Sequence, residues 1–267
     1  MSELTSTEKE KLFQLFTDNS SNISQKMIRE GKLSEVTPII NFSDTDFLEK
    51  YVRNEPWLPF TNHGIELMSP PFAYMIDDIK YLYQNNLYCD LLRGVQIGNK
   101  KFLDVGCGFG RGVNVIKNYF GADIDGYDIN ETFINYAKEQ FPNNNYYQTI
   151  NFDNYDTLVF VNSLHVVWNS GLIHILKEKE LLITDFFTAD SLRDFKELIK
   201  LNNWKVTLEQ DDTTKVIFGL QKDIDSIEKR FPEVSKTALS AYKHIQHNRL
   251  HQFQISHNKQ YKYHIEC

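Results

Sequence analysis

The stretch Phe102-Leu-Asp-Val-Gly-Cys-Gly-Phe-Gly-Arg-Gly112 decides how this chain folds. A short apolar run ends at Val105, and the chain then breaks into glycines that alternate with other residues. Glycines in such a loop let the backbone turn tightly and approach a ligand without a Cβ atom in the way. A helix is expected over 112–119, and its first turn would present unpaired N–H groups to that ligand. The stretch therefore predicts a strand, a ligand-binding loop and a helix, a pattern that several nucleotide-binding folds share.

From this loop onward the pattern alternates strands with helices. The predicted strands are 101–105, 122–128, 146–150, 157–161, 180–186, 204–210 and 260–266. The predicted helices are 112–119, 131–140, 191–201 and a long one around 226–246, with a short turn near 170–176. Such alternation predicts an α/β fold with a parallel sheet covered by helices on both faces.

The residues before the loop differ in character. Helical spacing of apolar residues predicts helices over 6–16, 23–31, 47–52 and 75–92, and an ordered, aromatic-rich loop over 57–74. We therefore divide the chain into a helical N-terminal cap over 1–98, which covers the substrate, and an α/β domain over 99–267.

Composition excludes several classes of protein. The net charge of −7 disfavours a nucleic-acid partner, because phosphate binding shows as clustered Lys and Arg. Three cysteines without a short metal-type spacing indicate free thiols in a reducing compartment, so we expect a cytoplasmic protein. No apolar run is long enough to span a membrane. The histidines near the C-terminus lack Cys or carboxylate companions, which favours a solvated, partly helical tail over a metal site: His244, His247, His251, His257 and His264.

Two carboxylates flank the glycine loop. Asp104 lies in the first predicted strand, where it would meet the ammonium group of an amino-acid ligand or the loop backbone, whereas a pyrophosphate would repel it. Asp128 ends the next strand, 24 residues later, near the spacing of an acid that accepts from both hydroxyls of a ribose. The alternative is that Asp104 caps the loop and Asp128 ends a strand, with no ligand. The pair favours an amino-acid nucleoside over a dinucleotide.

Phe102–Gly112, Gly126–Asn130 and Asn154–Val167 together resemble the class I S-adenosylmethionine (SAM)-dependent methyltransferases, in matching order and spacing. The resemblance implies a Rossmann-like sheet of seven mostly parallel strands with an antiparallel last strand. It implies SAM as cofactor and S-adenosylhomocysteine as product. It assigns Asp128 to the ribose hydroxyls and Ile129 to the adenine. The residues it assigns to the methionine portion are Asp104, Gly106, Cys107, Gly108 and Gly110.

One departure concerns the adenine amino group, which family members often hold with an acid after the third strand. Here that region reads YYQTINFD, so the contact falls to Asn151, Asp153 or a backbone group near Phe152.

The loop after the fourth predicted strand faces the sulfonium and the acceptor in the family. Asn162 would accept a hydrogen bond from the SAM amino group. His165 titrates near neutral pH and would take a proton from a hydroxyl or amine, although a Leu-His-Val run also suits a histidine packed under the loop. Asp185 is a second candidate base, because it closes a parallel strand at the ligand-binding edge. Phe186 beside it would form an apolar wall.

We expect residues of the predicted cap to line the binding site of the methyl acceptor. Trp57, Phe60, His63 and Tyr74 are candidates for the substrate wall, with core packing as the alternative for each. The sequence therefore predicts a SAM-dependent methyltransferase acting on an O, N or C nucleophile of a small molecule, and a homodimer remains open. The alternatives are a protein or RNA acceptor, or a SAM-fold subunit that does not catalyse. A nicotinamide oxidoreductase is disfavoured by Asp104.

Overall fold

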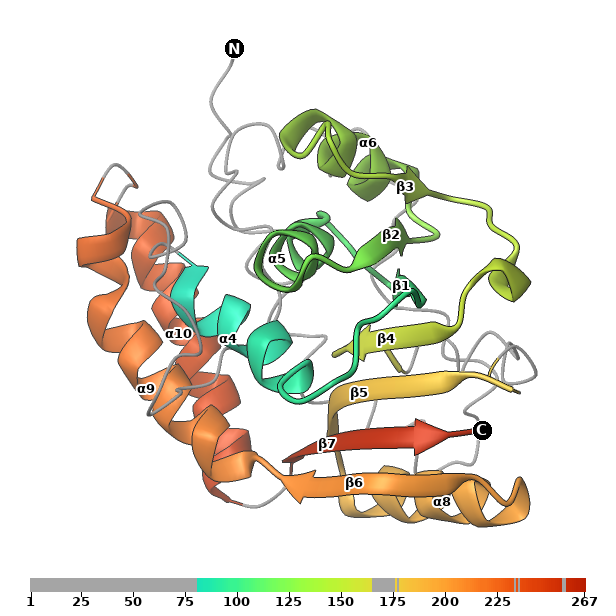
Figure 1. Cartoon of the computed structure of the whole chain (residues 1–267). Coiled ribbons are helices and arrows are strands. Elements are labelled where there is room, and N and C mark those ends of the chain that lie inside the picture. The colour runs from blue at the N-terminus through green and yellow to red at the C-terminus, as the bar shows by residue number, and fades with distance from the viewer. Residues whose placement is uncertain (1–80, 165–175, 177, 233, 235, 256–257) are drawn as a thin grey trace.

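The computed structural model describes residues 81–164, 176, 178–232, 234, 236–255 and 258–267. Within these residues seven strands form one sheet in the order β3-β2-β1-β4-β5-β7-β6 (Figure 1). The strands from β3 to β5 are parallel, and β7 runs antiparallel to both β5 and β6. Their bounds are β1 (Lys101–Val105), β2 (Asp123–Tyr127), β3 (Tyr146–Tyr147), β4 (Thr157–Val161), β5 (Glu180–Phe187), β6 (Lys205–Asp211) and β7 (Lys259–Glu266). The predicted sheet, mostly parallel with an antiparallel last strand, is confirmed.

Side chains alternate between the two faces of the sheet, as strand geometry requires. In β4, Val159 packs into a core with helices α4, α5, α6, α9 and α10, whereas Leu158 and Phe160 pack into a second core with α8. Helices therefore cover both faces, as the alternation predicts. Their bounds are α4 (Leu82–Leu91), α5 (Arg111–Phe120), α6 (Glu131–Gln140), α8 (Ala189–Leu201), α9 (Thr213–Arg230) and α10 (Lys236–Gln254), with a short 3₁₀ helix at Phe152–Asn154.

The long helix predicted around 226–246 is wrong. The chain forms two helices there, and α9 ends at Arg230. Phe231 leaves the helical region, with φ −128° and ψ 61°, because it precedes Pro232, whose ring disfavours the α conformation in the residue before it. The helices α9 and α10 thus form a hairpin inserted between β6 and β7, and they stand beside the end of β6 (Figure 1).

Two smaller differences concern β3 and the C-terminal histidines. The third strand is paired over only Tyr146–Tyr147, shorter than the predicted 146–150. His264 does not belong to a solvated tail: it is part of β7, and its Nε2 lies 2.9 Å from the carbonyl oxygen of Leu91 in α4. The helices predicted over 6–16, 23–31 and 47–52, and the turn near 170–176 except for Leu176, lie outside the described residues.

Neither metal-type clusters nor membrane-type helices occur among the described residues. No group of three or more His, Cys, Asp or Glu side chains gathers there as metal ligands would. None of the helices described combines the length and apolar character needed to cross a membrane.

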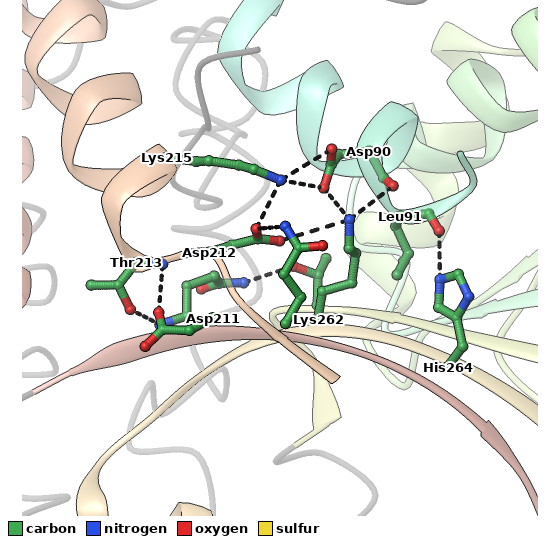
Figure 2. A network of polar contacts seen from close by, with 11 residues as sticks. Asp90, Leu91, Asp211, Asp212, Thr213, Lys215, Lys262 and His264 are labelled. Carbon is green, nitrogen blue, oxygen red and sulfur yellow. Dashed lines mark hydrogen bonds and ion pairs between the residues drawn. The ribbon is translucent and has the colours of Figure 1, made fainter. Parts of the chain in front are cut away.

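Four charged side chains join the helical hairpin to α4 and the sheet (Figure 2). The Lys262 ammonium lies 2.5 Å from Asp90 Oδ2, and both side chains are buried. Lys215 of α9 bridges Asp90 at 3.1 Å and Asp212 at 2.8 Å. Burial alone would raise the pKa of Asp90, but hydrogen bonds and charge from Lys262 and Lys215 outweigh it and hold that pKa below its usual value. We call Asp90, Asp212, Lys215 and Lys262 the charged quartet.

The quartet makes a stability prediction. Lys262→Met should lower the free energy of unfolding by on the order of 3 kcal/mol, because Asp90 and Asp212 stay buried after losing a counter-charge. Lys205→Met breaks an exposed ion pair between Lys205 of β6 and Glu266 of β7 and should change the free energy by less than about 1 kcal/mol. Urea denaturation of both variants measures the difference. Equal effects would contradict a stabilising role for the quartet.

Candidate active site

The glycine loop connects β1 to α5 and is fixed against the end of β2. The backbone N–H groups of Gly106 and Cys107 both donate to the carbonyl oxygen of Tyr127, at 2.8 and 3.0 Å. Gly106 has φ +76°, and a Cβ atom there would lie 2.7 Å from Cβ of Ser163. Only glycine therefore fits at this point.

Asp128 holds the loop from the other side. One carboxylate oxygen accepts from the Gly108 N–H at 2.9 Å, and the other accepts from the Asn130 N–H at 2.9 Å. Asn130 in turn caps α6 by accepting from the N–H of Thr132 at 2.9 Å. Burial raises the pKa of Asp128, and the two N–H donors partly oppose that shift. Each oxygen keeps a further lone pair, so the carboxylate can still accept hydrogen bonds from a ligand.

Asp104 is buried and incompletely satisfied. Its side chain is 1% exposed, and its Oδ2 atom has no hydrogen-bond partner among the described residues. A Cβ atom on Gly112 would lie 2.6 Å from this oxygen and 2.3 Å from the ring of Tyr88, so α4 and α5 both enclose it. Burial raises the pKa of Asp104 to about 7, and the nearby Asp128 charge adds to the shift. A buried carboxylate without a partner is costly, so a cationic ligand group would stabilise it.

Asn162 presents a second set of buried polar atoms without partners. It follows β4 directly and has φ +54°, a left-handed conformation that non-glycine residues rarely adopt. Both its side-chain oxygen and nitrogen are buried and find no partner in the described part of the chain. Because β1 and β4 are adjacent parallel strands, Asp104 and Asn162 lie at the same edge of the sheet. Together they provide acceptors and a donor for a ligand with both an ammonium and a carboxylate.

Comparison with known proteins agrees with this geometry. Residues 102–189 match the family model of a methyltransferase domain. By this match, residues 102–189 carry a methyltransferase domain. Such a domain implies SAM as its cofactor. By sequence, no curated protein matches the chain.

Solved structures of methyltransferases share the fold of this chain. Phospholethanolamine N-methyltransferase 2 of Haemonchus contortus, in complex with phosphomonomethylethanolamine and S-adenosylhomocysteine, has a TM-score of 0.56 at 16% identity, covering 84% of this chain and 58% of that one. A putative sarcosine dimethylglycine methyltransferase from Galdieria sulphuraria has a TM-score of 0.54 at 14% identity, covering 81% of this chain and 96% of that one. The StiE O-methyltransferase has a TM-score of 0.53 at 15% identity, covering 83% of this chain and 89% of that one. At these identities the likeness establishes the fold.

The residues expected at the adenine follow β2 and β3 in the chain. Ile129 follows Asp128 and is 54% exposed. The Phe152 ring packs edge-on against Tyr127, with ring centroids 5.2 Å apart. Asn151 caps the short 3₁₀ helix, and its side-chain oxygen accepts from the Asp153 N–H at 3.1 Å. The Asn151 oxygen thus already accepts one hydrogen bond. No contact with adenine is shown by these bonds, and the adenine contacts stay a prediction.

The other expected residues divide into buried and undescribed ones. Cys107 is buried in the glycine loop, where burial, followed by the charges of Asp104 and Asp128, raises the pKa of its thiol well above the usual value. It is therefore not a reactive thiolate, and its contact with the cofactor stays a prediction. The residues outside the described part of the chain are Trp57, Phe60, His63, Tyr74 and His165.

Asp185 lies at the end of β5 and faces the loop after β4. One oxygen accepts from the Leu164 N–H and the other from the Phe186 N–H, each at 2.8 Å. Burial raises the pKa of Asp185 to about 7, against the opposing effect of these N–H groups and that of Ser163. Phe186, the expected apolar wall, is 43% exposed.

One residue of the site was missed by the sequence reasoning, and a second was weighed there without being given a role. Tyr88 belongs to a helix outside the matched region, and no motif marks it. Ser163 donates its hydroxyl to the Val105 carbonyl oxygen at 2.5 Å and so ties the ends of β4 and β1 together. Its position directly after Asn162 was the available signal.

The raised pKa of Asp104 makes a prediction about stability and pH. A carboxyl with a pKa near 3.9 in the unfolded chain and about 7 in the folded one binds more protons when folded between these values. The folded state therefore loses stability as pH rises across this window, by up to about 1.4 kcal/mol per pH unit. Asp104→Asn lacks this contribution. The difference in free energy of unfolding, variant minus parent, should therefore increase from pH 5 to pH 7 and stay constant above pH 7. Urea denaturation at several pH values tests this, and a pH-independent difference would contradict it.

Proposed function

We propose that this protein transfers a methyl group from SAM to an O, N or C nucleophile of a small molecule. The observation that carries the proposal is the pair of buried, unpartnered polar side chains, Asp104 and Asn162, at the edge of the sheet that bears the glycine loop. Buried polar atoms without partners cost stability. A ligand with an amino-acid end would satisfy them, and SAM has one.

The chain's own residues divide the binding of SAM into two parts. Asp104 is placed to pair with the ammonium, and Asn162 to hydrogen-bond to the amino-acid end beside it. Asp128 is placed to accept from the ribose hydroxyls, since each of its oxygens has a free lone pair. We assign the adenine to the exposed face of Ile129 and to Asn151 and Phe152. At Gly108 a Cβ atom would meet nothing within 4 Å, and we assign this space to the methionine chain.

When bound, SAM supplies a methyl group already activated on a sulfonium. The protein then has to hold the nucleophile in line with that methyl and exclude water, and such positioning supplies most of the acceleration. We assign the acceptor side to the loop after β4, to Phe186, and to the predicted cap over 1–98 with Trp57, Phe60, His63 and Tyr74. His165 is our candidate base for acceptors that must lose a proton.

A small acceptor is favoured over a macromolecule by the charge of the chain. At −7 the net charge would repel RNA. The structural neighbours named above include an O-methyltransferase and enzymes whose names refer to small amines. The alternatives are a protein or RNA acceptor, and a SAM-fold subunit that does not catalyse. The unpartnered Asp104 weighs against the second, because a subunit without a ligand gains nothing from a buried, unpaired carboxylate.

Cofactor binding can be tested directly. Calorimetric titration with S-adenosylhomocysteine should show micromolar binding, and titration with NADH should show none. Asp128→Ala should weaken S-adenosylhomocysteine binding by about 10- to 100-fold, the value of one or two hydrogen bonds to a charged group. Asp123→Ala, an exposed carboxylate at the other end of β2, is the control and should bind as the parent does. Equal affinity of the Asp128→Ala variant and the parent would show that the ribose lies elsewhere.

The acceptor class can be tested with radiolabelled SAM. The protein is incubated with SAM labelled on the methyl group and with an extract separated by filtration into small molecules, protein and RNA. We expect the label in the small-molecule fraction. Label in protein or RNA would favour a macromolecular acceptor. If S-adenosylhomocysteine binds and no fraction is labelled, the result would favour the non-catalytic alternative.

A further inference from the structure

The loop of residues 162–164, which we call the β4 loop, is held in a conformation that the local sequence does not favour. Asn162 has φ +54°, a backbone state that costs free energy in a non-glycine residue and persists only where the surroundings enforce it. The Asn162 N–H donates to the Thr184 carbonyl oxygen at 2.9 Å. This conformation leaves the two polar side-chain atoms of Asn162 buried and unpartnered among the described residues. Something beyond Asn162 itself must hold the loop in place.

Two anchors hold the β4 loop, one on each side. Toward β1, the Ser163 hydroxyl donates to the Val105 carbonyl oxygen at 2.5 Å. Toward β5, the Asp185 carboxylate accepts from the Leu164 N–H at 2.8 Å, and the Ser163 N–H also favours its charged form. The second anchor is strongest when Asp185 is ionised, because several N–H donors converge on one side chain and none of them can accept a hydrogen bond.

The geometry of Asp185 is unsuited to taking a proton from an acceptor. Its side chain is 3% exposed. Both of its oxygens already accept from backbone N–H groups, those of Leu164 and Phe186. A general base must come within hydrogen-bond reach of the proton that it removes. The sequence suggested Asp185 as a base, whereas these contacts indicate that it holds the loop.

We propose that Asp185 is a positioning residue, which fixes the β4 loop so that Asn162 presents its side chain to the amino-acid end of the cofactor. The proposal rests on the proposed function, because S-adenosylhomocysteine is the probe that reports the position of Asn162. In this role Asp185 acts through Asn162 and does not touch the cofactor. An amide at position 185 keeps the size of the side chain but has only one acceptor oxygen, so one backbone N–H faces an NH₂ group and the anchor is weakened.

A double-mutant cycle separates this role from a general loss of stability. Asp185→Asn should weaken S-adenosylhomocysteine binding by about tenfold, because Asn162 is no longer held in place. In the Asn162→Ala background the same change should weaken binding less than twofold, because the side chain that Asp185 positions is gone. Coupling of this kind is expected only between residues that act through one another. A merely structural role would lower affinity equally in both backgrounds and would overturn the proposal.

Asp125→Asn is the matched control. Asp125 is as buried as Asp185, and its carboxylate accepts from Asn145 and Tyr155 at 2.9 and 2.7 Å. It lies on β2 and contacts neither the glycine loop nor the β4 loop in any of these bonds. The variant should lose stability and keep the affinity of the parent for S-adenosylhomocysteine. If it lost affinity as Asp185→Asn does, loss of any buried carboxylate would explain the effect and the proposal would fail.

Hydrogen exchange on the unmodified protein keeps the proposal testable if Asp185→Asn does not fold. The Leu164 amide should exchange as slowly as the amides inside β5, because the Asp185 carboxylate protects it. Fast exchange at Leu164 would overturn the proposal. Failure of the unmodified protein to bind S-adenosylhomocysteine would overturn the proposed function and this inference together. Binding by the parent with unchanged affinity in Asp185→Asn would overturn this inference alone.

Discussion

Asp128 joins the glycine loop to the end of β2 by accepting one backbone N–H from Gly108 and one from Asn130. This contact sets the path of the loop, and with it the start of α5 and the cap of α6. It also keeps a negative charge beside Asp104, which is already buried and lacks a full set of partners. Two carboxylates in one buried region oppose folding. Their cost is understandable if a ligand with an ammonium and two hydroxyls completes the site.

Helix α4 links that site to the rest of the molecule. On one side it places Tyr88 against Gly112, beside the unpartnered oxygen of Asp104. On another side it places Asp90 in the charged quartet, which holds the α9–α10 hairpin against β7 (Figure 2). The insertion between β6 and β7 and the enclosure of Asp104 therefore depend on the same helix. A buried ion pair is a poor source of net stability but a strong constraint on geometry, which suits a helix that must enclose a binding site.

The sequence predicted those parts of the structure that local pattern determines. The strands 101–105 and 157–161 match in full. The second reads as the nearly continuous apolar run of a buried parallel strand, and the first is marked by the glycines that follow it. The pairing of β3 over two residues was not predicted, because pairing depends on a neighbouring strand. The helix expected around 226–246 ignored Pro232, which local rules could have used. The contacts of Asp185 and Lys262 join residues 21 and 172 positions from their partners, and no motif connects such distant positions. In the site, Asp104, Asp128 and Asn162 were found from the strand ends, whereas Tyr88 was not.

The central claim is that Asp104 is kept for the ammonium of the cofactor, and proton release on binding tests it most directly. Burial leaves Asp104 partly protonated near pH 7, and an ammonium beside it would lower its pKa and drive that proton into solution. Calorimetry of S-adenosylhomocysteine binding at pH 7, in two buffers that differ in ionisation enthalpy, counts the protons released. We predict a fraction of one proton released by the parent and a smaller fraction by Asp104→Asn. Binding with equal proton release by the two proteins would contradict the account.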